Sequence, residues 1–178
     1  VKEGDELVLG SHTLKFFGAP MVHWPEVIVT YDTKDKVLFS ADAFGKFGTL
    51  DTDEDWACEA RRYYFNICGK YGNNVAALLK KASGLTINKI LPLHGPILEG
   101  EKMDEALRLY TLWSHYEPEA EGILVAYASI HGGTKACAER FAEMLKEKGA
   151  KKVSLFDLCR DDMAEAIEDA FKFGKLVL

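Results

Sequence analysis

Two potential metal ligands stand just outside a predicted β-hairpin. His23 precedes the β-rich run 27–31, and Asp42 follows the run 36–40. The polar tetrad 32–35 between the two runs is typical of a hairpin turn. Because antiparallel pairing returns the chain to its start, we expect the imidazole and the carboxylate to lie close together.

A third potential ligand, His94, closes another β-like run, residues 87–93. We expect all three side chains to converge at one edge of a sheet. Imidazole and carboxylate ligands without cysteine favour iron, zinc or manganese over a structural thiolate zinc site. Asp42 could bridge two metals, and the ligands still missing would come from elsewhere in the protein or from water. The alternative is that His23 and His94 are satisfied strand-end histidines that bind no metal.

A second candidate site is the loop that follows the apolar run 123–127 and precedes a predicted helix. It consists of Ser129, Ile130, His131, Gly132, Gly133 and Thr134. Its backbone amides and the Ser129 and Thr134 hydroxyls would form a phosphate cradle. Without a Walker lysine or a GxGxxG motif, a mononucleotide such as FMN is favoured over a nucleoside triphosphate or a dinucleotide. The alternative is a glycine-rich turn that holds no ligand.

Aromatic residues lie next to His23 and in the segment after the hairpin. We predict that Trp24 and the Tyr63–Tyr64 pair are core aromatics, although either tyrosine could donate its phenol to a metal-bound oxygen species. The spacing of apolar residues over 56–71 predicts a helical face. Its N-cap is expected at Asp51, Thr52 or Asp53.

The order of predicted elements divides the chain into two domains. Residues 1–118 combine short β-like runs with helical patterns. An acidic, proline-containing connector at 117–122 follows. Residues 122–178 then alternate strand, helix, strand, helix and strand, which predicts an α/β fold with a parallel, doubly wound sheet.

Bulk composition narrows the class of protein. The net charge of -6 and the pI near 5.4 argue against a general affinity for nucleic acid or anionic membrane. No apolar run approaches the ~20 residues that span a bilayer. Four cysteines without a CxxC pair are expected to be free thiols in a reducing cytoplasm. The chain begins at Val1 and ends on the strand-like stretch 175–178, so we expect it to be an internal part of a longer protein.

Together these pieces resemble the flavodiiron proteins, or A-type flavoproteins. The resemblance is carried by Met21-Val22-His23-Trp24-Pro25-Glu26, Leu38-Phe39-Ser40-Ala41-Asp42-Ala43-Phe44-Gly45, Arg61-Arg62-Tyr63-Tyr64, Leu93-His94-Gly95 and the loop 129–134. The His-Trp-Pro-acid and Ser-x-Asp-Ala-Phe-Gly strings are specific, whereas all flavodoxins share the phosphate loop.

The resemblance implies a fold and a role for each candidate residue. Residues 1–118 would be the C-terminal portion of a metallo-β-lactamase-like αββα diiron domain, and 122–178 the N-terminal portion of a flavodoxin-like FMN domain. His23 would bind one iron and His94 the other, with Asp42 as the bridge. Tyr63 would lie behind these ligands, and Ser129, His131, Gly132, Gly133 and Thr134 would hold the FMN phosphate.

The resemblance also implies an activity. Electrons would pass from a donor such as rubredoxin to FMN and on to two irons, which reduce dioxygen to water or nitric oxide to nitrous oxide. A head-to-tail homodimer would bring the FMN of one subunit to the irons of the other. Two other functions stay open: a dizinc hydrolase of metallo-β-lactamase fold fused to a flavodoxin-like module, and a non-catalytic electron-transfer or scaffold protein.

Three departures from the family pattern affect these expectations. The upstream His-x-Glu-x-Asp ligand motif is absent, and so are the later loops that hold the flavin ring. We therefore expect the 178-residue chain alone to bind metal and flavin poorly. Gly133, often asparagine in the family, removes one side-chain amide from the phosphate loop.

Overall fold

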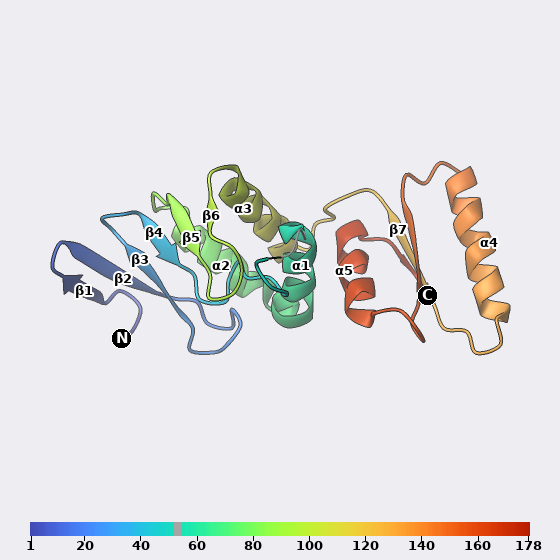
Figure 1. Ribbon diagram of the computed structural model, residues 1–178, viewed down its shortest axis with the longest axis horizontal. Coiled ribbons are helices and arrows are strands. Elements are labelled where there is room, and N and C mark those ends of the chain that lie inside the picture. Colours follow the sequence, from blue (N-terminus) through green and yellow to red (C-terminus); the bar gives the residue numbers. More distant parts are fainter. Residues whose placement is uncertain (52–54) are drawn as a thin grey trace. The chain divides into compact units, whose positions relative to one another are not determined.

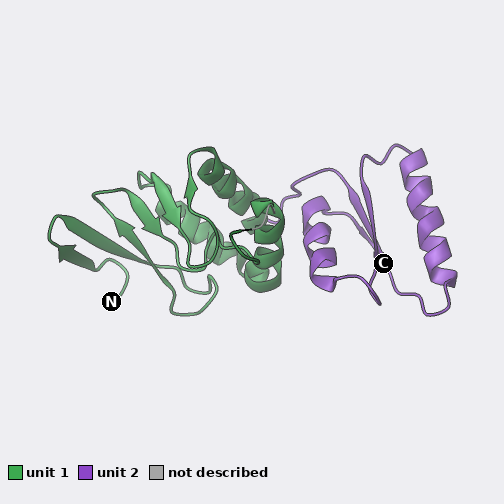
Figure 2. Cartoon of the chain, in the orientation of Figure 1, with its two compact units in different colours: residues 1–115 green, residues 116–178 purple. Residues whose placement is uncertain are grey.

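The computed structural model describes residues 1–51 and 55–178. The chain forms two compact units, Val1–His115 and Tyr116–Leu178 (Figures 1 and 2). Each unit has its own sheet, and each is described separately below.

The first unit contains a six-stranded sheet in which the strands follow one another in chain order. The strands are β1 (Glu6–Leu9), β2 (His12–Gly18), β3 (Ile28–Asp32), β4 (Val37–Phe39), β5 (Lys89–Leu91) and β6 (Leu98–Glu99). The predicted hairpin is formed by β3 and β4, with Tyr31 opposite Leu38. Neighbouring strands are antiparallel except β4 and β5, which are parallel. The C-terminal ends of β4 and β5 therefore lie side by side at one edge of the sheet.

Helices cover one face of this sheet (Figure 1). They are α1 (Trp56–Tyr63), the π-helical turn η1 (Tyr64–Cys68), the 3-10 turn η2 (Gly69–Tyr71), α2 (Gly72–Ala82) and α3 (Glu101–Ser114). The core between helices and sheet includes Leu38 and Ile90 from the strands and Val75, Leu109 and Trp113 from the helices. All five are at most 2% exposed. The helices therefore pack tightly against the strands that precede the candidate ligands Asp42 and His94.

The start and the course of the first helix differ from the prediction. Asp55 caps α1, because its carboxylate accepts a hydrogen bond of 3.3 Å from the Ala57 amide. The expected cap at Asp51 is therefore wrong, and Thr52 and Asp53 lie outside the described residues. The predicted helical face also does not continue as one α-helix, since the chain widens into a π-turn after Tyr63.

The second unit is a three-stranded parallel sheet with spatial order β8-β7-β9. Its elements are β7 (Ile123–Tyr127), α4 (Gly133–Glu147), β8 (Val153–Asp157), α5 (Met163–Phe173) and β9 (Leu176–Val177). Helices α4 and α5 flank the sheet on opposite sides (Figure 1). The predicted parallel, doubly wound arrangement is confirmed. Among the described residues of both units, no helix combines the length and the apolar character that crossing a membrane requires.

Candidate metal centre and phosphate loop

His23, Asp42 and His94 lie together beyond the ends of β4 and β5. The Nε2 atom of His23 is 3.4 Å from Oδ2 of Asp42, and the Nε2 atom of His94 is 3.6 Å from Oδ1. Each oxygen of one carboxylate thus faces its own imidazole. The three side chains are 24%, 20% and 39% exposed, so a small ligand can reach them.

These two distances are longer than hydrogen bonds and compatible with ligands that share a metal. They exceed the usual range for an N–H···O hydrogen bond, about 2.7–3.2 Å. Nitrogen and oxygen atoms that each lie about 2.1 Å from one tetrahedral metal are about 3.4 Å apart. Each imidazole and the Asp42 oxygen that it faces are therefore at a separation compatible with one shared metal.

The loop that carries Asp42 is held by buried hydrogen bonds. Ser40 is fully buried, and its hydroxyl donates to the carbonyl of Ala43 over 2.7 Å. The amide of Phe44 donates to the phenol oxygen of Tyr110 over 2.7 Å. Since Tyr110 belongs to α3, the helical layer fixes the loop directly.

Two residues of this loop have left-handed backbone conformations. Ala41 has a φ of 52° and Phe44 a φ of 66°. This conformation costs an L-residue roughly 1–2 kcal/mol. It persists where the surroundings determine it, and such residues cluster at functional sites.

The tautomer of His94 is set by a backbone carbonyl. Its Nδ1 atom lies 3.1 Å from the carbonyl oxygen of Lys46, which can only accept a hydrogen bond. A neutral His94 therefore carries its proton on Nδ1 and presents the lone pair of Nε2 toward Asp42. This is the usual arrangement of a metal-binding histidine.

His23 lies at the tip of the loop between β2 and β3. The amide of Ala19 donates to the carbonyl of Val27 over 2.8 Å, which closes the loop at its base, and Val22 is fully buried. Trp24, in contrast, is 60% exposed, so its predicted place in the core is wrong. Its ring lies 5.5 Å from that of His23 and shields one side of the imidazole.

Tyr63 differs from Tyr64 in what surrounds its ring. Tyr63 is 3% exposed, and its ring centroid is 4.7 Å from that of His94 and 6.4 Å from that of His23. Its hydroxyl is buried and has no hydrogen-bond partner among the described residues. Tyr64 instead packs against the core rings of Tyr110 and Trp113. Of these two tyrosines, Tyr63 therefore adjoins both imidazoles and Tyr64 belongs to the core.

Burial raises the pKa values of two acids near the cluster. It raises the pKa of the Tyr63 phenol well above its ordinary value, and the nearby Cys68 and Asp42 add to the effect. Burial, with the charge of Asp42, raises the pKa of the Cys68 thiol to about 12. Both groups therefore keep their protons well above neutral pH, and the Tyr63 phenol can donate a hydrogen bond.

The predicted phosphate loop is open and lies at the start of α4. The Gly132 amide donates to the hydroxyl oxygen of Ser129 over 3.0 Å, so this oxygen already closes the loop from inside. Gly132 has a φ of +84°, and a Cβ at Gly132 or Gly133 would meet nothing within 4 Å. No side chain caps α4, and Ile130 is 85% exposed.

A further group of donor atoms holds two hairpin turns together. One oxygen atom each from Asp32 and Asp35 and a ring nitrogen of His12 lie within 4.8 Å of one another. One oxygen of Asp32 lies 2.6 Å from Nδ1 of His12, and the other accepts from the Lys34 amide over 2.9 Å. Both oxygens are therefore engaged in joining the β1–β2 turn to the β3–β4 turn.

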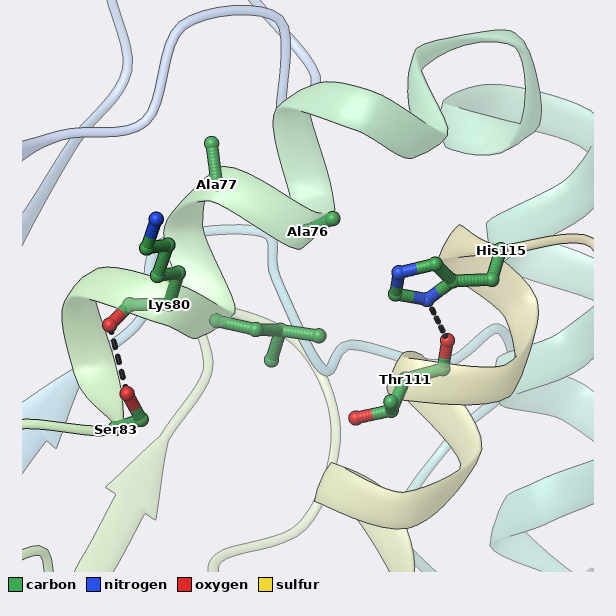
Figure 3. A pocket seen from close by; sticks show the side chains of 7 residues that line it. Ala76, Ala77, Lys80, Ser83, Thr111 and His115 are labelled. Carbon is green, nitrogen blue, oxygen red and sulfur yellow. Dashed lines mark hydrogen bonds between the residues drawn. The ribbon is translucent and has the colours of Figure 1, made fainter.

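A hollow of about 500 Å³ lies between α2 and α3 (Figure 3). Its lining includes none of the predicted ligands. The polar groups at its edge bond their own helices: the Ser83 hydroxyl donates to the Lys80 carbonyl, and Nδ1 of His115 lies 2.8 Å from the Thr111 carbonyl. The hollow therefore offers few free polar groups to a ligand.

Comparison with known proteins identifies the family. The model of the ODP family beta lactamase matches residues 1–95. The anaerobic nitric oxide reductase flavorubredoxin of Aeromonas hydrophila is 30% identical over 184 residues, which cover 97% of this chain and 37% of that protein. The rubredoxin oxygen:oxidoreductase of Desulfovibrio gigas superposes with a TM-score of 0.89 and 25% identity, over 99% of this chain and 46% of that one. The flavodiiron protein of Giardia intestinalis gives a TM-score of 0.87 and 29% identity, over 94% of this chain and 43% of that one.

The chain spans less than half the length of each of these relatives. Within that span, the predicted fold class is confirmed: part of a metallo-β-lactamase-like domain is followed by part of a flavodoxin-like one. The chain therefore belongs to the ODP family of beta lactamases, and flavodiiron proteins are among the solved structures that it resembles.

Proposed function

We propose that the protein containing this chain is an oxidoreductase that reduces dioxygen to water, nitric oxide to nitrous oxide, or both. The observation that carries this proposal is the single carboxylate of Asp42 with one imidazole nitrogen facing each of its oxygens. A carboxylate flanked in this way suits two adjacent metals. Relatives named as an oxygen oxidoreductase and a nitric oxide reductase support the substrate class.

In this proposal each ligand has one task. His23 would hold one iron, His94 would hold the other, and Asp42 would be the ligand common to both, while further ligands would come from outside these 178 residues or from water. The irons, when bound, supply the electrons and the open coordination positions that a diatomic substrate needs. The hydrogen bond from Nδ1 of His94 to the Lys46 carbonyl keeps the ring oriented while Nε2 binds.

Tyr63 would act beside the metals. Its buried hydroxyl has no partner among the described residues, and its ring adjoins both imidazoles. Since the phenol keeps its proton at neutral pH, it can donate a hydrogen bond to a substrate oxygen. The ring of Phe47 packs edge to face against that of Tyr63 at 5.3 Å and supports its orientation.

The second unit would bind FMN through its phosphate. The loop of Ser129, Ile130, His131, Gly132, Gly133 and Thr134 offers uncapped amides at the start of α4. Its exposure leaves space for the ligand, and Gly133 lets the backbone approach the phosphate closely. We expect the Ser129 hydroxyl to donate its own proton to the phosphate while its oxygen still accepts from Gly132.

The remaining partners follow from the same proposal. Electrons would come from a donor such as rubredoxin, and a head-to-tail homodimer would let the FMN of one subunit serve the irons of the other. The reaction would take place in the cytoplasm. Neither nucleic acid nor membrane is required by the proposed chemistry.

Metal analysis combined with gas consumption tests this function. The full-length protein should contain two irons and one FMN per chain, and it should consume dioxygen or nitric oxide when reduced rubredoxin is supplied. His23→Ala should abolish this consumption and leave the FMN content unchanged. Bound zinc with hydrolytic turnover would instead favour the dizinc hydrolase, and unchanged consumption in His23→Ala would leave only a non-catalytic function for the cluster.

A further inference from the structure

Gly45 lies where its lack of a side chain decides the position of His94. A Cβ built on Gly45 would be 2.3 Å from Cε1 of His94, 2.6 Å from its Nδ1 and 2.9 Å from its carbonyl oxygen. Carbon atoms in van der Waals contact are about 3.5–4.0 Å apart. The imidazole therefore occupies the space that a side chain at Gly45 would fill.

The backbone of Gly45 does not itself require glycine. Its φ lies outside the left-handed region, whereas Gly95, the residue after His94, has a φ of +126°. A turn that needs a positive φ explains Gly95 but not Gly45. The requirement for glycine at Gly45 is therefore one of space beside the imidazole.

Other contacts hold the same imidazole. The Lys46 carbonyl accepts from Nδ1 over 3.1 Å, and the Lys46 amide donates to the His94 carbonyl over 3.2 Å. The ring of Tyr63 meets the imidazole edge to face. With these contacts fixed, a methyl group at Gly45 leaves the ring no place to move without losing one of them.

We propose that Gly45 is a positioning residue for the metal centre. The absence of its side chain lets the His94 imidazole lie with Nε2 toward Oδ1 of Asp42, at 3.6 Å. This inference rests on the proposed function, in which Nε2 of His94 binds one of two irons. Relieving the clash requires the ring to move by about 1 Å, whereas metal–ligand distances tolerate about 0.2 Å.

Iron affinity tests the proposal in the full-length protein. Gly45→Ala should lower the affinity for one of the two irons by about 10- to 100-fold in competition with a chelator, as other changes behind a metal ligand do. The matched control is Gly84→Ala, because a Cβ at Gly84 has only the Lys81 carbonyl at 3.8 Å, an ordinary contact. Gly84→Ala should bind both irons as the wild type does, and wild-type affinity in Gly45→Ala would overturn the proposal.

A thermal-unfolding cycle on the metal-free protein separates this inference from the proposed function. Gly45→Ala should lower the melting temperature more when His94 is present than in a His94→Ala background, because the added methyl meets the imidazole. Equal losses in both backgrounds would overturn the proposal, since the clash would then lie with the backbone oxygen. If Gly45→Ala does not fold, folding of the double variant supports the proposal and its failure to fold rejects it. A wild-type protein without iron would reject the metal centre, while this cycle would still decide whether Gly45 positions His94.

Discussion

The two candidate sites are built in opposite ways. The metal cluster draws His23, Asp42 and His94 from three separate loops, and buried bonds such as Phe44 to Tyr110 hold the Asp42 loop to a helix. The phosphate loop of 129–134 is one continuous stretch, buried at Ser129, exposed over 130–134 and closed by a local hydrogen bond from Gly132 to Ser129. Folding of the first unit thus orders the candidate metal ligands in advance, whereas the candidate phosphate loop depends on local backbone geometry. Substitutions in the core of the first unit should therefore weaken iron binding and leave FMN binding unchanged.

The largest effect is expected from Asp42→Asn. Loss of the charge and of one oxygen removes the ligand common to both metals, so iron content should fall to background and oxygen or nitric oxide consumption should cease. FMN content should remain that of the wild type. Metal analysis, flavin absorbance and circular dichroism on the full-length protein measure these quantities.

Asp35→Asn is the matched control, because Asp35 is an exposed carboxylate in the β3–β4 turn. It should retain full iron content. Retention of both irons in Asp42→Asn would refute the bridging role, and a parallel loss of FMN would refute the separation of the two sites.

The next effect is expected from Tyr110→Phe, which changes the core rather than a ligand. The variant leaves the buried amide of Phe44 without its partner, at a cost of about 1–3 kcal/mol in the free energy of unfolding. Urea denaturation should show this loss, and iron should be released at a lower chelator concentration. FMN affinity should not change.

Tyr71→Phe provides the comparison for Tyr110→Phe. Tyr71 is only partly buried, and no hydrogen bond of its hydroxyl is found among the described residues. Its variant should match the wild type in stability and iron binding. Equal behaviour of the two variants would show that the helical layer does not order the Asp42 loop.

A smaller effect, now on FMN alone, is expected from Gly132→Ala. An L-residue at the φ of +84° costs roughly 1–2 kcal/mol, so the loop should relax away from its shape and FMN affinity should fall about 5- to 30-fold. The control is Gly149→Ala at the other end of α4, with a φ of +92° and equally free surroundings. The control should lose stability but not FMN affinity, and equal FMN losses in both variants would contradict a specific role for the loop.

Local sequence patterns were enough to predict the parts of the fold that depend on local pairing. The hairpin of β3 and β4 follows from two β-rich runs around a polar tetrad, and the parallel sheet of the second unit follows from its alternation of elements. The sequence also predicted that His23, Asp42 and His94 meet at one edge of the sheet, because each lies next to the end of a predicted strand. The flanking positions of His23 and Asp42 carry most of this information.

The supporting contacts were not predictable from such patterns. Tyr110 bonds Phe44 across 66 residues of sequence, and only the packed α3 brings them together. The π-turn after Tyr63, the cap at Asp55 and the two-residue strand β6 depend on tertiary packing rather than on residue spacing. Trp24 misled the prediction because an aromatic side chain favours the core in general, whereas here it lies on an exposed loop tip beside His23.

The smallest expected effect is a difference in thiol reactivity between the cysteines of the two units. Cys68 in the first unit is buried, whereas Cys137 and Cys159 in the second are exposed. At pH 8 a thiol reagent should modify the two exposed cysteines rapidly and Cys68 only slowly, since its pKa is about 12. Fast modification of Cys68 in the folded protein would show that the core around the metal cluster opens readily.

The same thiol predicts a pH dependence of stability. The pKa of Cys68 rises from an ordinary value of 9.0 to about 12 on folding, so above pH 9 the unfolded state binds fewer protons than the folded state. The free energy of unfolding should therefore be independent of this group below pH 9 and fall above it, by at most about 1.4 kcal/mol per pH unit. Cys68→Ala should reduce this slope between pH 9 and 10, and Cys137→Ala should leave it unchanged. An unaltered slope in Cys68→Ala would mean that the thiol is not desolvated in the folded state, and the first unit would then be less tightly closed around Asp42 than its contacts indicate.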